Sequence, residues 1–328
     1  MTKTAQRGCA GLALGLFALA FTACSSDNPA MPDGGPMNDG GGGDGGPLGN
    51  GMVGTISPAA MVSTPLDATP DPDGKTIYFT AISPIDGPGV FSVAASGGNV
   101  TKVYAGDPFV SPFGIAITGD GKTLYIADSG ATNASDTGSV WVLPVGGGMP
   151  TALSGPDGFK PKSVEVSGSD LYFTGIDPMS GSAGGYKVPT AGGMVSVVAN
   201  GLSDPSGITV DAKGTAYIVD TIGSGNQAQV ISASNGTGTL LIDAIGVGYP
   251  AGIALAQDES AILVSGLDPQ KGTDVVYRFE ISAKALTKND KGIDTFNESA
   301  GLHRAKNQDI YAWADSRANG GTVFVLSK

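Results

Sequence analysis

A phrase of strand, turn and strand recurs six times in this chain, at intervals of 44 to 49 residues, and fills almost everything after residue 60. Each copy opens on a Pro-x-Gly step or a close variant of it. The six openings are Pro65-Leu66-Asp67, Pro112-Phe113-Gly114, Pro161-Lys162-Ser163, Pro205-Ser206-Gly207, Pro250-Ala251-Gly252 and Ser299-Ala300-Gly301. A repeat of this length with several strands is typical of units that bury their faces only against neighbouring units.

The rest of each repeat supplies further strands and the turns between them. Third strands such as residues 90–93 and 140–143 are followed by glycine turns, which provide the positive φ angles of tight hairpins. Fourth strands such as residues 100–104 and 195–198 then close the outer edge of each repeat. The sequence therefore predicts an all-β fold, a six-bladed β-propeller.

The sixth repeat lacks a fourth strand, because the chain ends soon after Phe324 and Val325. A strand-like segment, Met52 to Ile56, precedes the first repeat and has no partner of its own. We expect this segment to complete the last blade, since a closed ring protects strand edges that would otherwise pair with other molecules. In the alternative, the ring stays open and the glycine-rich segment before it runs directly into the first blade.

The first residues have the pattern of a bacterial lipoprotein signal peptide. Lys3 and Arg7 precede an apolar run from Gly8 to Ala20. Phe21-Thr22-Ala23-Cys24 then resembles a lipobox, where a signal peptidase cuts before the cysteine and a diacylglycerol is attached to its sulfur. The alternative is an ordinary secretory signal with a chance cysteine. A membrane-spanning helix is disfavoured, because the apolar run is shorter than the roughly 20 residues that such a helix needs.

This pattern divides the chain into three parts. Residues 1–23 are predicted to be the signal peptide, residues 24–52 the lipidated Cys24 with a flexible tether, and residues 53–328 the propeller. The tether is rich in Gly, Asp and Pro, and its few apolar side chains cannot offset the entropy of ordering. We therefore expect a propeller held by lipid at the bacterial cell envelope, at the outer membrane or the periplasmic face.

Charge excludes one class of partner. The chain has 30 Asp and Glu residues against 18 Lys and Arg residues, which gives a formal net charge of −12. A surface that follows phosphates needs clustered basic side chains, so we expect no nucleic-acid binding.

The second repeat carries a family resemblance. Ser111 to Ala116, which read Ser-Pro-Phe-Gly-Ile-Ala, lead into Asp120 to Ser129, which read Asp-Gly-Lys-Thr-Leu-Tyr-Ile-Ala-Asp-Ser. These phrases resemble the NHL and SMP-30/gluconolactonase group of six-bladed propellers, and the resemblance extends over residues 60–328. It is specific for the fold and says little about activity, because this fold hosts lactonases, synthases and pure binding modules.

For the lactonase branch, the resemblance implies a divalent metal at the mouth of the central channel, held by carboxylate and amide side chains. One recurrent source of ligands is the middle residue of the Pro-x-Gly step. None of these residues suits a hard cation here: they are Leu66, Phe113, Lys162, Ser206, Ala251 and Ala300. We predict no metal site and no cofactor, while a divalent ion such as calcium stays open.

Other catalytic motifs are missing from the sequence. The single histidine, His303, excludes a multi-histidine metal site. The Gly-Lys-Thr steps at residues 74–76 and 121–123 lack the upstream glycine of a phosphate-binding loop, and no Gly-x-Ser-x-Gly elbow is present.

One column of the repeat alignment holds two large ionisable residues among small ones. It contains Thr69, Ala116, Glu165, Thr209, Ala254 and His303. The third and sixth blades of a six-bladed ring are opposite, so Glu165 and His303 would face each other across the channel and could act as base and acid. In the alternative each is satisfied separately, Glu165 by Lys160 or Lys162 and His303 by the backbone.

A second column lies at the end of each second strand and holds Asp128, Asp220 and Asp315 in the even-numbered repeats. The odd-numbered repeats have Ala81, Gly175 and Gly266 there, which suggests a unit of two blades used three times. The three carboxylates could ring one face and bind a ligand. Alternatively, each caps its own loop through an Asx turn.

These observations favour a lipid-tethered, non-catalytic module that binds a small molecule, a glycan or a protein on the propeller face. The alternative is a divergent SMP-30/gluconolactonase-like lactonase or hydrolase acting at the central channel. A structural part of an envelope assembly is a third possibility.

Overall fold

The computed structural model describes residues 55–61, 63–130, 138–222, 227–268, 273–289, 299–316 and 321–327. The signal peptide, Cys24 and the tether lie outside these ranges, so the predictions made for them stay predictions. The described chain forms strands β1 to β24, arranged in six four-stranded antiparallel sheets, and it contains no helix. In particular, the described residues include no helix that is long and apolar enough to span a membrane.

Each sheet is one blade, and we number the blades in chain order. Blade 1 comprises β2 (Pro65–Pro70), β3 (Thr76–Ser83), β4 (Gly87–Ala94) and β5 (Thr101–Ala105). Blade 2 comprises β6 (Pro112–Ile117), β7 (Thr123–Asp128), β8 (Ser139–Pro144) and β9 (Thr151–Ala152). Blade 3 comprises β10 (Val164–Ser167), β11 (Asp170–Ile176), β12 (Ala183–Pro189) and β13 (Ser196–Asn200).

The second half of the ring repeats this order. Blade 4 comprises β14 (Pro205–Val210), β15 (Ala216–Ile222), β16 (Gln227–Ser234) and β17 (Thr237–Ile245). Blade 5 comprises β18 (Gly248–Leu255), β19 (Ala261–Asp268), β20 (Thr273–Glu280) and β21 (Ala285–Asn289). Blade 6 comprises β22 (Ser299–Arg304), β23 (Tyr311–Asp315), β24 (Thr322–Ser327) and β1 (Thr55–Met61).

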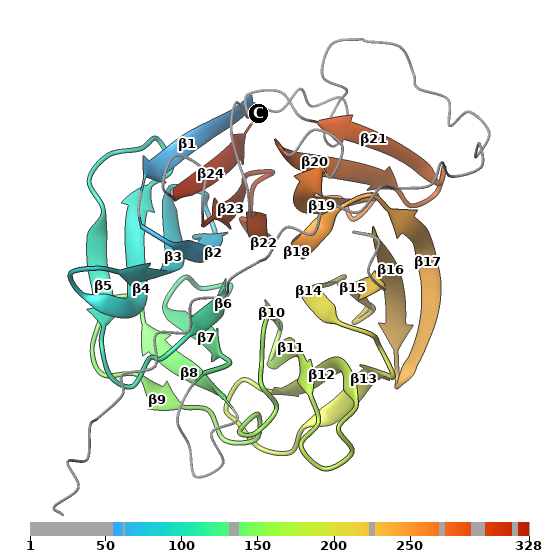
Figure 1. Ribbon diagram of the computed structural model, residues 1–328, viewed down its shortest axis with the longest axis horizontal. Coiled ribbons are helices and arrows are strands. Elements are labelled where there is room, and N and C mark those ends of the chain that lie inside the picture. The colour runs from blue at the N-terminus through green and yellow to red at the C-terminus, as the bar shows by residue number, and fades with distance from the viewer. Residues whose placement is uncertain are drawn as a thin grey trace, which may run out of the picture. The chain divides into compact units, whose positions relative to one another are not determined.

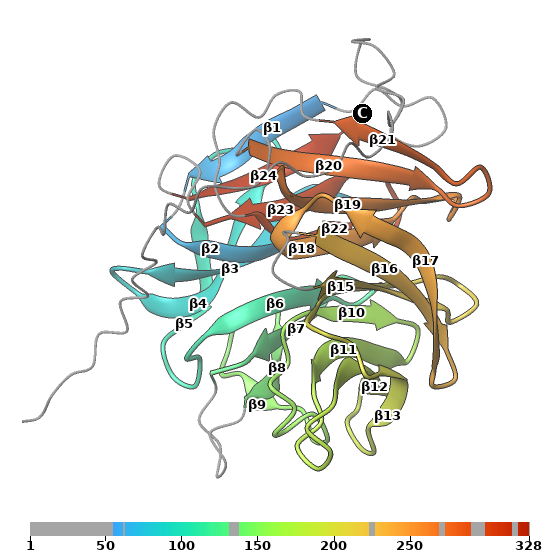
Figure 2. The ribbon, with the colours of Figure 1, turned by 45° about the vertical axis from the view of Figure 1, so that its right-hand side comes forward.

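The six blades stand around a central axis, with the first strand of each repeat innermost (Figure 1). Figure 2 shows each sheet running outward from this inner strand to a strand at the rim. The predicted all-β, six-bladed propeller is therefore confirmed.

The N-terminal strand closes the ring, as expected. β1 pairs antiparallel with β24, from Thr55 opposite Ser327 to Met61 opposite Thr322. The paired strand begins three residues later than the predicted Met52–Ile56 segment and runs on to Met61. The edge of β24 is thus covered by a strand from the other end of the propeller.

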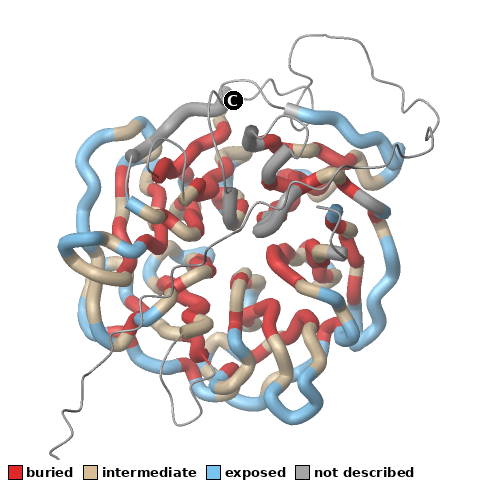
Figure 3. The backbone as a smooth tube through the Cα atoms, in the orientation of Figure 1, coloured by how far each residue is buried: buried red, intermediate tan, exposed pale blue. Residues whose placement is uncertain are grey.

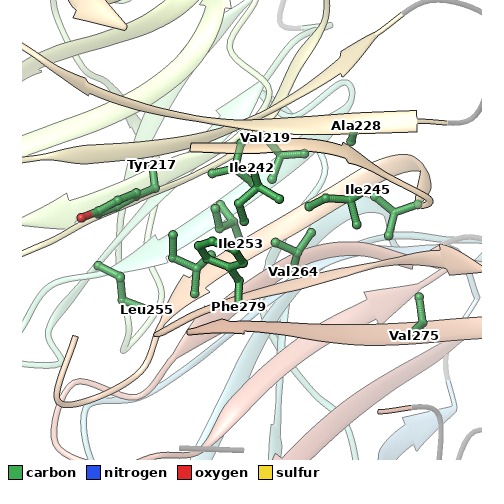
Figure 4. Close-up of a cluster of buried hydrophobic side chains, with 13 residues drawn as sticks. Tyr217, Val219, Ala228, Ile242, Ile245, Ile253, Leu255, Val264, Val275 and Phe279 are labelled. Carbon is green, nitrogen blue, oxygen red and sulfur yellow. The ribbon is translucent and has the colours of Figure 1, made fainter. Parts of the chain in front are cut away.

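The core lies between the blades. Figure 4 shows one such layer, in which Val219 and Ile242 of blade 4 pack against Ile253, Val264 and Phe279 of blade 5. Buried residues concentrate on the inner strands of the blades, and exposed residues on the rim (Figure 3). Each sheet therefore buries its apolar residues against its two neighbours, and the closed ring gives every blade two of them.

Candidate functional site

Glu165 and His303 meet at the centre of the ring. Glu165 lies on β10, the inner strand of blade 3, and His303 lies on β22, the inner strand of blade 6. Oε2 of Glu165 is 3.1 Å from Nδ1 of His303, which is hydrogen-bonding distance. The two side chains predicted to face each other across the channel are therefore in contact across it. Glu165 does not pair with Lys162, which instead forms an ion pair with Asp204.

A third ionisable residue, Asp67 on β2 of blade 1, completes the cluster. Its Oδ2 lies 3.1 Å from Nε2 of His303 and also accepts a hydrogen bond of 3.0 Å from the backbone amide of Ile115 in blade 2. Its Oδ1 accepts a 2.7 Å hydrogen bond from the amide of Ala68. Both imidazole nitrogens of His303 therefore face a carboxylate, one from the adjacent blade and one from the opposite blade.

Sequence reasoning missed Asp67, although its signal was present in the repeat. Asp67 occupies the third position of the Pro-x-Gly step, where four other repeats have glycine and blade 3 has Ser163. The glycines are needed because the inner strands approach closely. A β-carbon on Gly114 would lie 2.6 Å from the carbonyl oxygen of Lys162 in the next blade. A charged residue at a repeat position that otherwise holds only glycine or serine is therefore an exception. A neighbouring blade must leave room for its side chain.

Gly301 provides the space for Asp67. Gly301 lies at the same repeat position in blade 6 and has a φ of 64°. A β-carbon placed there would overlap Oδ1 of Asp67. The carboxylate of blade 1 can thus reach His303 because blade 6 has no side chain at this point.

The three side chains of the cluster are buried to different extents. The side chains of His303 and Asp67 are 3% and 4% exposed, whereas that of Glu165 is 28% exposed. Burial alone would lower the pKa of His303, but attraction to Asp67 and hydrogen bonds to both carboxylates outweigh burial and raise it to about 10. At neutral pH the cluster is therefore an imidazolium between two carboxylates.

A small cavity of about 30 Å³ adjoins the cluster, on the side where the inner strands end. Glu165 and His303 line it, with Arg304 and Lys306 from blade 6 and Thr118 from the β6–β7 turn. A cavity of this size holds one or two water molecules. It is too small for a sugar or a lactone ring in this conformation.

The described residues include no group of three or more His, Cys, Asp and Glu placed to hold a metal ion. In the cluster itself, both nitrogens of His303 are engaged by carboxylates, and a metal ligand would have to be neutral imidazole. The side chains of Asp67, Glu165 and His303 therefore suit a cluster held together by hydrogen bonds and ion pairs better than they suit a metal site.

The three predicted ligand-binding aspartates lie in blades 2, 4 and 6. Asp128, Asp220 and Asp315 are 0%, 1% and 0% exposed. Two of them cap the loop before their own inner strand: Asp128 accepts hydrogen bonds from the amides of Val110 and Ser111, and Asp220 from those of Ser203 and Asp204. The observed role of these two is the loop cap, and ligand binding by the trio stays a prediction.

In the odd-numbered blades, the residue directly before the position aligned with these aspartates makes a different hydrogen bond. Thr80, Thr174 and Ser265 each donate a hydroxyl hydrogen bond to a carbonyl at the start of the next inner strand. The acceptors are the carbonyl oxygens of Phe113, Ser206 and Gly301, at 2.9, 2.8 and 2.9 Å. Hydroxyls in blades 1, 3 and 5 thus alternate with carboxylates in blades 2, 4 and 6, in agreement with a two-blade unit used three times.

Comparison with known proteins supports the fold. No protein-family model and no curated protein matches the chain. Among solved structures, a PQQ-bound aldose sugar dehydrogenase from Streptomyces coelicolor gives a TM-score of 0.59 at 14% identity, over 84% of this chain and 98% of that chain. A gluconolactonase from Xanthomonas campestris gives 0.58 at 16% identity, over 84% and 89%.

A further structural neighbour comes from a nidogen–laminin complex, with a TM-score of 0.53 at 21% identity, over 72% of this chain and 82% of that chain. The neighbours therefore include two sugar-related enzymes and one part of a protein–protein complex. At such low identity these structural neighbours establish the propeller fold, which the sequence repeats also predict. They leave the activity of this chain open.

Proposed function

We propose that this chain is a non-catalytic binding module, a propeller displayed at the bacterial cell envelope on a lipid anchor at Cys24. Its ligand or protein partner would bind on the propeller face, and the ion cluster at the centre would hold the ring together. The observation that carries the proposal is the position of His303 between Asp67 and Glu165.

This geometry disfavours acid–base chemistry by the pair. A general base must be able to take up a proton near the working pH. With a pKa of about 10, His303 already carries both ring protons at neutral pH. Each proton is directed at a carboxylate, so releasing one to a substrate would break either the buried pair with Asp67 or the partly buried pair with Glu165.

The second candidate is a hydrolase in which Glu165 acts without His303. Two observations favour it: Glu165 is partly exposed and lines the small cavity beside Arg304, and one structural neighbour is a gluconolactonase. For this function the cavity would have to widen before a substrate could reach the carboxylate.

Lactone hydrolysis separates the two candidates. We would incubate the purified protein with glucono-1,5-lactone, with and without Ca²⁺, Mg²⁺ or Zn²⁺, and follow acid release. The wild type, Glu165→Gln and the matched control Glu259→Gln in the β18–β19 turn are compared. We expect no hydrolysis above the uncatalysed rate in any of them, together with a lower melting temperature for Glu165→Gln alone. Hydrolysis by the wild type that is lost in Glu165→Gln and kept in Glu259→Gln would overturn the non-catalytic proposal.

A further inference from the structure

The outer edge of blades 2 and 3 carries no charged residue over two long stretches. Residues 144–156 and 189–203 contain no Asp, Glu, Lys, Arg or His, although 15% of the residues in the chain are charged. Each stretch comprises the hairpin between the third and fourth strands of its blade and the fourth strand itself, which is β9 or β13. By contrast, the fourth strands of blades 1, 4 and 5 contain Lys102, Asp243 and Lys288. We call the two stretches the uncharged rim.

Two large apolar side chains project from the uncharged rim into water. Met149 and Met194 are 74% and 84% exposed. They occupy the same position in their hairpins, directly after a pair of glycines with positive φ. Val197 on β13 adds a third apolar side chain, which is 45% exposed. Apolar side chains gathered on an uncharged surface mark a place where a protein contacts a partner or a membrane.

Hydrogen bonds hold both hairpins in place. The amide of Gly147 donates to the carbonyl oxygen of Pro144 at 2.9 Å, and the amide of Gly192 donates to that of Pro189 at 2.8 Å. The amide of Gly193 donates to the carbonyl oxygen of Ser154 in blade 2, at 3.0 Å, and so joins the two blades at the rim. A surface that is already ordered loses little conformational freedom when it is covered.

The predicted tether enters the propeller at the end of the ring where these hairpins lie. In every blade, the third strand runs toward its hairpin with the fourth strand. Thr55, the first residue of β1, pairs with Ser327, the last residue of the third strand β24 in blade 6. β1 therefore begins at the same end of the ring as the hairpins of Met149 and Met194. Along the rim, β1 is followed by β5, β9 and β13 (Figure 1).

The length of the tether keeps this end of the ring close to the membrane. We expect residues 24–52 to be flexible, and a flexible chain of about 30 residues has a root-mean-square end-to-end distance of about 30 Å. A lipid on Cys24 would therefore hold Thr55 within about this distance of the bilayer. The chain has a net charge of −12, and its acidic surfaces are repelled by anionic lipid headgroups. The uncharged rim is not.

We propose that the uncharged rim lies against the bilayer to which the protein is anchored, with Met149 and Met194 inserted among the lipid headgroups. This inference depends on the lipid anchor of the proposed function, and it adds an orientation. The loops between the second and third strands, at the opposite end of the ring, then face away from the membrane and are open to a partner. Two methionines bury too little apolar area to hold a protein at a membrane, so the anchor provides the affinity and the rim sets the orientation.

Methionine oxidation tests the proposal without any substitution in the propeller. Met179 is the internal control, because it is 95% exposed and lies in the β11–β12 loop at the opposite end of the ring. The purified lipidated protein on phosphatidylcholine vesicles is compared with the Cys24→Ser protein free in solution. Both are treated with chloramine-T, a charged oxidant that enters lipid poorly. Mass spectrometry of peptides then gives the rate of sulfoxide formation at each methionine.

On vesicles, Met149 and Met194 should be oxidised about fivefold more slowly than in the free protein, because lipid covers them. Met179 should be oxidised at the same rate in both. Unchanged rates at Met149 and Met194 on vesicles would overturn the proposal. An equal slowing of all three methionines would also overturn it, because the propeller would then have no preferred orientation.

Two further outcomes are distinguishable from these. A wild type that does not sediment with vesicles would refute the lipid anchor, and the same rates are then measured with a histidine tag in place of residues 1–24, on vesicles of phosphatidylcholine and a nickel-chelating lipid. This second measurement decides the orientation by the same criteria. Slow oxidation of Met149 and Met194 in the free protein that becomes faster on dilution would overturn the proposal, because the uncharged rim would then contact a second copy of the chain.

Discussion

Asp67 and His303 are separated by 236 residues in the sequence, yet their side chains lie 3.1 Å apart across the junction of blades 1 and 6. The same imidazole contacts Glu165 from blade 3 on the far side of the channel. One histidine thus links the first, third and last blades at the axis of the ring. Because the pair with Asp67 is buried, we expect it to contribute to stability in a strongly pH-dependent way.

The first prediction concerns that pH dependence. The pKa of His303 is raised from 6.5 to about 10, so the folded state holds the proton more tightly than the unfolded state. The stabilisation is fully present below about pH 6.5 and is lost as pH rises through about 10. We expect the free energy of unfolding, measured by urea denaturation, to fall across this window in the wild type. The free energy of unfolding of His303→Gln should fall less steeply over the same pH range. If it depended on pH as that of the wild type does, this would contradict the charged state of His303.

The same variant should also lower stability at neutral pH. His303→Gln leaves the buried carboxylate of Asp67 without its cation, and breaking one side of a buried ion pair typically costs about 3–5 kcal/mol. Glu165→Gln should cost less, about 1 kcal/mol, because Glu165 is partly exposed and glutamine keeps a hydrogen-bond acceptor. Denaturant titration at pH 7 checks the order, and a larger loss in Glu165→Gln than in His303→Gln would show that Asp67 is not the main partner.

A third prediction concerns the glycine that makes room for Asp67. Gly301→Ala introduces a methyl group that overlaps the Asp67 carboxylate and also strains a residue at φ 64°. Gly168→Ala in the β10–β11 turn is the matched control, since Gly168 has φ 60° and a β-carbon added to it would meet nothing within 4 Å. The control should lose about 1–2 kcal/mol from backbone strain alone. Gly301→Ala should lose at least about 2 kcal/mol more, and equal losses would mean that Asp67 moves aside without cost.

Ring closure gives a fourth prediction. Removing residues up to Met61 deletes β1 and exposes the edge of β24, whereas removing residues up to Gly51 leaves β1 intact. The longer truncation should lower the melting temperature by about 5 °C or more and promote association through the open edge. Light scattering and thermal unfolding check both effects. Two truncations with the same melting temperature would show that β1 contributes nothing to the ring.

The lipid anchor is the fifth prediction and rests on the lipobox-like step at Cys24. Cys24→Ser should release the protein from the membrane fraction and abolish labelling with a palmitate analogue. Cys9→Ser, within the predicted signal peptide, is the control and should change neither. Membrane retention with unchanged labelling in Cys24→Ser would refute lipidation at this residue.

The fold could be predicted because the repeat can be recognised directly in the sequence. Periodic openings, alternating strands and glycine turns are local signals, and six of them determine a ring with little ambiguity. The closing strand was also predictable, since a sixth repeat without a fourth strand requires a partner from elsewhere. Its bounds were less so, because residues 57–61 include Pro58 and no clear apolar alternation.

The central cluster was only half predictable. Alignment of the repeats placed Glu165 and His303 in one column, and the symmetry of a six-membered ring placed them opposite each other. Asp67 belongs to another column, and its contact with His303 depends on the absence of a side chain at Gly301 in the neighbouring blade. Such a contact arises from the distance between two inner strands, and a column of the alignment carries no information on that distance.

The pairing of β1 with β24 also has a consequence for how the protein is made. β1 is synthesised before the other strands of the propeller, and its partner β24 is synthesised after all of them. The pair can therefore form only when almost the whole propeller has been made. Its closing contact spans nearly the full length of the propeller, and contacts of such long range form slowly. We therefore expect the six sheets to assemble before the ring shuts, with the seam between blades 6 and 1 as the last part to become protected from hydrogen exchange during refolding.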